Sequence, residues 1–182
     1  INNVLGLFNP GASIPLLEVL LPVGVSFFTF QALSYVFDIY LGKIEHEEKF
    51  HRYALFIAFF PALVAGPIVR ASEFLPQLKS KISITGANLQ AGVTLIIWGL
   101  FKKMVIADNL GKYVDIVYSN PDAYSSLYII AATIFFGVQI YCDFSGGTDI
   151  TRGAAQMMGI ELPVNFERPF FATSMANFWQ RW

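Results

Sequence analysis

The sequence predicts an all-α protein whose helices cross a membrane, and its composition is the first reason. Of 182 residues, 55% are hydrophobic and 14% are charged, whereas an average soluble domain has about 25% charged residues. A helix needs about 20 consecutive apolar residues to cross a hydrocarbon core of about 30 Å. Several charge-free segments approach that length, and turn-forming residues separate them. We therefore expect about four membrane helices, with broken and interfacial helices among them.

The four expected spans are residues 19–37, 53–69, 82–101 and 123–142. Residues 1–17 are also free of charge, but their asparagine, proline and glycine predict a connection. In the second span, Pro61 and the pair Gly66-Pro67 predict a kink or break near its end, because proline removes a helical hydrogen bond. Asn120-Pro121-Asp122 predicts a turn before the fourth span, with Ser119 or Asn120 as its cap.

The connections between the spans leave the membrane orientation open. Residues 42–52 are rich in charge and predict a solvated turn, in which His46 and His51 have no third ligand nearby. Lysine and arginine divide six against six between the two sides, so the positive-inside rule gives no orientation. This division places Lys102 and Lys103 in a connection that follows the third span.

The most polar segment follows the fourth span directly. It contains the candidate site residues Asp143, Ser145, Thr148, Asp149 and Arg152. Ionisable groups near a bilayer are costly, so such a cluster is a functional-site hypothesis. We expect residues 145–148 to end the helix and Thr148 or Ser145 to cap a new one over residues 149–158. Its polar stripe of Asp149, Arg152 and Gln156 either lines a substrate cavity or lies among lipid headgroups.

Two further segments carry charge next to a break. Arg70 follows Gly66-Pro67, and it either anchors in headgroups or faces the same cavity as Asp143 and Asp149. Pro163 and Pro169 predict an irregular segment over residues 161–169. A helix is expected from Thr173, with one polar face and one aromatic face that suits an interfacial anchor.

Composition also excludes several classes of protein. A net charge of −1 lacks the basic face of a nucleic-acid-binding protein. Cys142 is the only cysteine, so neither an internal disulfide nor a cysteine-rich metal site is possible. No catalytic trio and no metal constellation is visible among the residues. At this point a solute transporter with broken helices and a membrane enzyme both remain open.

Five segments in order resemble the membrane-bound O-acyltransferase family, and within it the alginate O-acetyltransferase-like branch. They are residues 21–31 (LPVGVSFFTFQ), 63–74 (LVAGPIVRASEF), 141–146 (YCDFSG), 148–150 (TDI) and 177–182 (NFWQRW). The sequence departs from the family pattern at Gly147, where tyrosine is usual, at Gln180, where arginine is common, and at Val164, where a polar residue is more frequent.

The resemblance implies that residues 1–182 are part of one membrane domain, incomplete at both ends, of a multi-pass enzyme in a bacterial inner membrane. It implies acetyl transfer from a thioester such as acetyl-CoA, as a co-substrate, to hydroxyls of an exported polysaccharide such as alginate. No bound cofactor and no metal is implied. The expected partners are the bilayer, the polysaccharide and periplasmic acetylation proteins. D-alanyl transfer to teichoic acid by the same fold is an alternative.

The resemblance also assigns expected roles to residues. An essential histidine is expected just after Trp182, so no catalytic residue is expected within these 182. Asp143, Ser145, Thr148, Asp149, Arg152 and Arg70 would line or support a substrate tunnel. Asn177, Trp179 and Arg181 would position the segment that carries the histidine.

Overall fold

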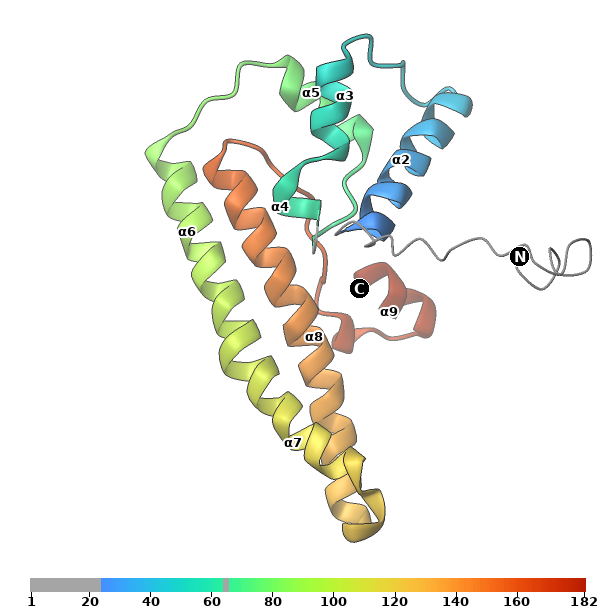
Figure 1. The fold of residues 1–182 in the computed structure, drawn as a ribbon, viewed down its shortest axis with the longest axis vertical. Coiled ribbons are helices and arrows are strands. Elements are labelled where there is room, and N and C mark those ends of the chain that lie inside the picture. The colour runs from blue at the N-terminus through green and yellow to red at the C-terminus, as the bar shows by residue number, and fades with distance from the viewer. Residues whose placement is uncertain (1–23, 64–65) are drawn as a thin grey trace, which may run out of the picture.

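A computed structural model describes residues 24–63 and 66–182, and within these ranges every regular element is a helix and no strand is present. The prediction of an all-α fold is confirmed. One continuous helix is formed by α6 (Gly86–Leu100), the π-helix η1 (Phe101–Ala107) and α7 (Asp108–Ser119), and it lies antiparallel to the single long helix α8 (Ser126–Met157). Smaller helices gather at one end of this hairpin (Figure 1).

The two long helices have recognisable starts and ends. The Thr85 hydroxyl caps α6 by accepting a hydrogen bond from the Asn88 amide at 3.2 Å. A short 3-10 turn, η2 (Pro121–Ala123), precedes α8. The expected cap at Ser119 or Asn120 is wrong, because α8 begins at Ser126 and extended Ser125 precedes it. At its far end, Gly159 has a φ of 77°, and its amide and that of Ile160 close the helix on the carbonyls of Gln156 and Ala155.

Only two helices of the described ranges are long and apolar enough to cross a membrane, Gly86–Ser119 and Ser126–Met157. At 1.5 Å per residue the second is about 48 Å long, more than a hydrocarbon core of about 30 Å. They contain most of the third and fourth expected spans, apart from residues 82–85 and 123–125. The figure of four spans is not confirmed.

The other two expected spans form shorter helices. The first corresponds to α2 (Val25–Tyr40), 16 residues long, with residues 19–23 outside the described part. The second is divided into α3 (Phe50–Ile57) and α4 (Phe60–Leu63). Pro61 explains the break, because it lacks the amide that would bond to the carbonyl of Ile57. The expected break is therefore present, but it begins at Ala58, earlier than predicted.

The glycines of residues 145–148 do not end a helix, contrary to the prediction, and no new helix starts at Asp149. Helix α8 is continuous from Ser126 to Met157. Within it, the Thr148 hydroxyl donates to the Ser145 carbonyl at 2.9 Å, so it does not cap a terminus. Gly146 is needed for close packing, since a Cβ there would lie 2.8 Å from the Gly99 carbonyl oxygen.

A small apolar core anchors the shorter helices to the end of α8. Its buried side chains come from α3, from α5 (Ala71–Lys79), from α8 and from the segment after it, and they include Phe56, Phe74, Ala155 and Ile160. The Thr151 hydroxyl ties α8 to α4 by donating to the Pro61 carbonyl at 2.9 Å. The irregular segment predicted over residues 161–169 is confirmed, apart from the start of the short turn η3 (Pro169–Phe171). Helix α9 (Met175–Arg181) then returns the chain to the middle of α8.

Candidate functional site

Glycines bring the backbones of α6 and α8 into contact where the polar residues lie. A Cβ at Gly92 would lie 2.6 Å from the Gly153 carbonyl oxygen, and one at Gly99 would lie 2.6 Å from the Gly146 carbonyl oxygen. Real Cβ atoms do not approach so closely. Gly92 and Gly99 are seven residues apart on α6, and Gly146 and Gly153 are seven residues apart on α8. One face of each helix therefore contacts the other helix over about two turns.

Lys102 lies one turn beyond this contact and forms a buried ion pair. Its Nζ is 2.6 Å from Asp149 Oδ2 and donates to Ser145 Oγ at 3.1 Å. The side chains of Lys102 and Asp149 are only 11% and 15% exposed. A buried charge needs a close partner and further hydrogen bonds to offset its desolvation, and both are present here.

Lys103 forms a second link between the same helices. Its Nζ contacts Asp143 on α8 and lies 3.1 Å from Asp108 Oδ1 at the start of α7. Both lysines belong to the first turn of the π-helix η1, a rare helical form that is concentrated at functional sites. The prediction that they lie in a connection is wrong, because acidic partners on α8 allow both charges to remain within a continuous helix.

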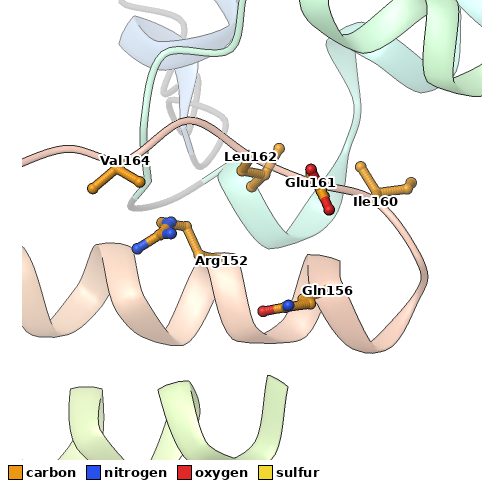
Figure 2. A pocket seen from close by; sticks show the side chains of 6 residues that line it. All are labelled: Arg152, Gln156, Ile160, Glu161, Leu162 and Val164. Atoms are coloured by element: carbon orange, nitrogen blue, oxygen red, sulfur yellow. The ribbon is translucent and has the colours of Figure 1, made fainter. Parts of the chain in front are cut away.

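Arg152 extends the ion-paired group toward a pocket. One of its guanidinium nitrogens lies 3.5 Å from Asp149 Oδ1. The pocket has a volume of about 270 Å³ and lies between α8 and the segment after it (Figure 2). Its lining consists of Arg152, Gln156, Ile160, Glu161, Leu162 and Val164. Arg152 Nε is buried without a hydrogen-bond partner in the described part of the chain.

The C-terminal residues pack against the middle of α8. The Trp182 ring centroid lies 4.9 Å from that of Phe166 and 6.4 Å from that of Tyr141. Ser174 caps α9 by accepting from the Asn177 amide at 3.1 Å, and Asn177 Oδ1 accepts from Arg181 Nε at 2.9 Å. The helix predicted from Thr173 therefore exists and begins two residues later.

A family model described as the membrane-bound O-acyltransferase family matches residues 44–182. The chain belongs to the membrane-bound O-acyltransferase family. It is 34% identical to the peptidoglycan O-acetyltransferase of Helicobacter pylori, over 91% of this chain and 36% of that protein. It is also 34% identical to the probable alginate O-acetylase AlgI of Pseudomonas aeruginosa, over 92% of this chain and 32% of that protein.

A third relative acts on a different polymer by its name. The teichoic acid D-alanyltransferase of Bacillus subtilis is 28% identical over 88% of this chain and 41% of its own length. The chain thus spans less than half the length of these three relatives. The family match shows the membrane-bound O-acyltransferase family, and the 34% identical alginate O-acetylase supports the alginate-like branch. The comparisons give no support to a solute transporter.

In this O-acyltransferase family member, the nine candidate site residues fall into separate places. Asp143, Ser145, Asp149 and Arg152 lie together around the two lysines. Thr148 is buried and bonds within its own helix. Asn177 and Arg181 bond to each other in α9, while Trp179 is 66% exposed.

Arg70 lies elsewhere. It precedes α5 and lines a different pocket, of about 440 Å³, together with Asp38 and Lys43 beside α2. The alternative in which Arg70 shares a cavity with Asp143 and Asp149 does not match this placement. His46 and His51 are exposed, and no group of three or more histidine, cysteine or acidic side chains in the described residues suits a metal ion.

Lys102 and Lys103 are the site residues that the sequence prediction missed. A signal for them existed: the charge-free segment that ends at Phe101 resumes after the two lysines with Met104, Val105, Ile106 and Ala107. Apolar residues on both sides of a charged pair indicate a helix that continues through it, and the facing span offers Asp143 and Asp149 as partners.

Proposed function

We propose that the complete protein is a membrane-embedded O-acyltransferase that moves acetyl groups onto hydroxyls of an exported polysaccharide such as alginate. The family match supports acyl transfer, and two relatives named as O-acetyl-transferring enzymes, each 34% identical, support acetyl as the group. D-alanyl transfer to teichoic acid remains the second candidate, because a relative with that name is 28% identical.

The packing of Trp182 against Tyr141 carries this proposal. Tyr141 lies one turn of α8 from Ser145, which Lys102 contacts. A residue that follows Trp182 in the complete protein would then start near Tyr141, one turn from Ser145. A histidine placed there would take the proton of a sugar hydroxyl near neutral pH. The hydroxyl oxygen would attack the acetyl carbonyl of the thioester, the carbon–sulfur bond would break, and the thiolate would leave and take up a proton.

This reaction needs an environment that excludes water, and the apolar surfaces of the two long helices are consistent with such an environment inside a membrane. A membrane-embedded site excludes water that would otherwise hydrolyse the acyl donor. We propose a bacterial inner membrane as the location and an acetyl thioester such as acetyl-CoA as the donor. The polysaccharide and periplasmic acetylation proteins are the proposed partners.

Acetyl transfer by the complete protein in lipid vesicles tests the proposal. We expect label from an acetyl thioester to appear in added polysaccharide, and we expect alanine in place of the first histidine after Trp182 to abolish transfer without loss of membrane insertion. Alginate, peptidoglycan and teichoic acid serve as separate acceptors. Transfer of D-alanine alone would favour the second candidate, and full activity of the histidine variant would overturn the mechanism.

A further inference from the structure

The segment after α8 contains two residues in an unusual backbone conformation. Phe166 has a φ of 61° and Arg168 has a φ of 50°, and they are the only non-glycine residues of the described ranges with a positive φ. This left-handed region is unfavourable for side chains, because the Cβ atom comes close to the following carbonyl oxygen. Arg168 also precedes Pro169, which restricts its backbone further. Such conformations persist only where surrounding contacts fix them, and they are concentrated at active sites and ligand clamps.

The side chain of Arg168 does not explain this conformation. It is exposed, and within the described part of the chain its guanidinium group has neither a hydrogen bond nor an ion pair. The Arg168 carbonyl accepts from the Phe171 amide at 3.1 Å as part of the turn η3. The conformation of Arg168 therefore serves the path of the backbone and not a contact of its side chain.

The two left-handed residues flank Glu167, and the backbone of Glu167 bonds to the end of α9. The Glu167 amide donates to the Arg181 carbonyl at 2.7 Å, and the Glu167 carbonyl accepts from Arg181 Nη1 at 3.4 Å. Arg181 Nε also donates to Asn177 Oδ1 at 2.9 Å. Both backbone groups of Glu167 thus bond to the residue that precedes Trp182.

The Phe166 ring holds Trp182 itself against α8. Its centroid lies 4.9 Å from that of Trp182, 5.8 Å from that of Tyr141 and 5.4 Å from that of Phe144. Because φ and ψ set the direction of each side chain and amide, an extended backbone here would direct the ring and the Glu167 amide elsewhere. One short segment therefore fixes both the ring of Trp182 and the carbonyl that precedes it.

We propose that residues 166–168 position the chain that follows Trp182, and that this role requires the left-handed backbone of Arg168 and not its side chain. The inference rests on the proposed acyl transfer, in which a histidine after Trp182 takes the proton of the acceptor hydroxyl. Arg168 is a positioning residue, since it acts through the residues that it holds. Displacement of a reacting group by about 1 Å can cost about 100-fold in rate.

Three substitutions of Arg168 separate its backbone from its side chain. Glycine adopts a positive φ without steric cost, and alanine meets the same limits as arginine, whereas a β-branched residue is a genuine outlier there. Arg168→Gly and Arg168→Ala should therefore keep kcat near the value of the unmodified protein. Arg168→Val should lower kcat roughly 10- to 100-fold, with no change in the KM for the acetyl thioester or for the polysaccharide.

Lys81→Val is the matched control. Lys81 is an exposed basic residue of another irregular segment, and its φ is not positive, so valine is tolerated there. Arg181→Lys is a second test in case Arg168→Val does not fold. It keeps the charge but loses the planar group that reaches both Asn177 and Glu167, and it should also lower kcat without a change in either KM.

Two measurements on the complete protein test the proposal. Acetyl transfer in lipid vesicles gives kcat and both KM values. Hydrogen–deuterium exchange in detergent does not depend on catalysis, and it reports how often the contact between Glu167 and Arg181 opens. We expect faster exchange of the peptide that contains Glu167 in Arg168→Val, and unchanged exchange in Arg168→Gly and in Lys81→Val.

Several results would overturn the inference. Normal kcat in Arg168→Val or in Arg181→Lys would show that the contact does not position a reacting group. An equal loss of kcat in Arg168→Ala and Arg168→Val would assign the role to the side chain. A raised KM for the thioester at normal kcat would make the segment part of donor binding. Absence of acetyl transfer by the unmodified protein would instead count against the proposed function, and the exchange measurement would still decide whether the Arg168 backbone holds Arg181.

Discussion

Lys102 lies in an apolar helix because Asp149 and Ser145 complete its hydrogen bonding. The ammonium group has a carboxylate oxygen at 2.6 Å and a hydroxyl oxygen at 3.1 Å. Removing one partner of such a pair leaves the other charge buried without compensation, which costs more than removing both. The Asp149 carboxylate in turn holds Arg152 at the edge of the pocket.

Lys102→Met should destabilise the complete protein by about 3–5 kcal/mol, because the Asp149 carboxylate would keep only its long contact with Arg152. Lys102→Met combined with Asp149→Leu should recover part of the loss, because no buried carboxylate remains unpaired, although Arg152 loses its contact with Asp149. Thermal unfolding in detergent measures both. Lys112→Met, at an exposed position of α7, should change stability by no more than about 0.5 kcal/mol. A double variant as unstable as the single one would contradict the pairing.

Glu47 provides a pH-dependent contact outside the long helices. Its side chain is 2% exposed and lies 3.0 Å from Lys79 and 3.5 Å from Arg52. The hydrogen bond from Lys79 is the main reason why the pKa of Glu47 lies below its ordinary value of 4.5, although burial opposes this shift. The folded state binds the proton less readily than the unfolded chain, so the contact stabilises the fold above the unfolded pKa.

This stabilisation should disappear as the pH falls from about 4.5 through the lower pKa of the folded state. Glu47→Gln should therefore lower stability at neutral pH and flatten the acid side of the stability profile. Thermal unfolding of the unmodified protein and the variant should be measured from about pH 3 to about pH 7, a range that brackets the ordinary carboxyl pKa. The neighbouring exposed residue supplies the control, since Glu48→Gln should leave the profile unchanged.

At the scale of elements, the glycine pairs set the distance between α6 and α8. The Gly99 and Gly146 backbones approach so closely that an added Cβ would meet a carbonyl oxygen, not a movable side chain. This approach lets lysine side chains of η1 reach the carboxylates of α8. The glycines that look like helix breakers in the sequence are therefore the residues that allow two continuous helices to pack.

Gly99→Ala should destabilise the hairpin by about 1–3 kcal/mol, because the helices must separate to accept the methyl group. Gly137→Ala on α8 is the matched control: no atom lies within 4 Å of its added Cβ, and alanine favours a helix by up to about 1 kcal/mol. Thermal unfolding of the complete protein should separate the two variants. Equal stability would show that the helices do not pack as described.

At the scale of the whole molecule, the two long helices form a hairpin that can cross a bilayer once in each direction. Their connection at residues 120–125 lies at one end, and residues 82–85 and 158–160 lie at the other. Both helices exceed the length that a span requires. Their exposed apolar side chains, such as Ile97, Ile130 and Ile134, suit contact with lipid or with further helices.

Cysteine labelling should place the two ends of this hairpin on opposite sides of the membrane. In a background with Cys142→Ala, we expect Asp122→Cys and Ser83→Cys to react with a membrane-impermeant maleimide from opposite faces of oriented vesicles. The test also supplies the orientation that the lysine and arginine count left undecided. Labelling of both positions from the same face would contradict a spanning hairpin.

Much of the local structure was predictable. The all-α fold, the break near Pro61, the irregular segment after α8 and the helix that includes Asn177 depend on composition and on neighbouring residues. The failures at Lys102 and at residues 145–148 share one cause. Charge and glycine predict the end of a helix when only neighbouring residues are considered, whereas in the fold each has a partner on a facing helix.

The sequence by itself determined that this protein is built from apolar helices, and its ordered motifs indicated the family. Those properties follow from hydrophobicity, proline and short-range hydrogen bonding, which act within a few residues. Only the tertiary structure decided that Gly99 contacts Gly146 and that Lys102 pairs with Asp149. It also decided that Arg70 lies apart from these two contacts. These contacts depend on the register between helices, which is set when the helix backbones pack. A buried charge is tolerated only opposite a group of opposite charge, and a glycine allows close packing only opposite another closely approaching backbone.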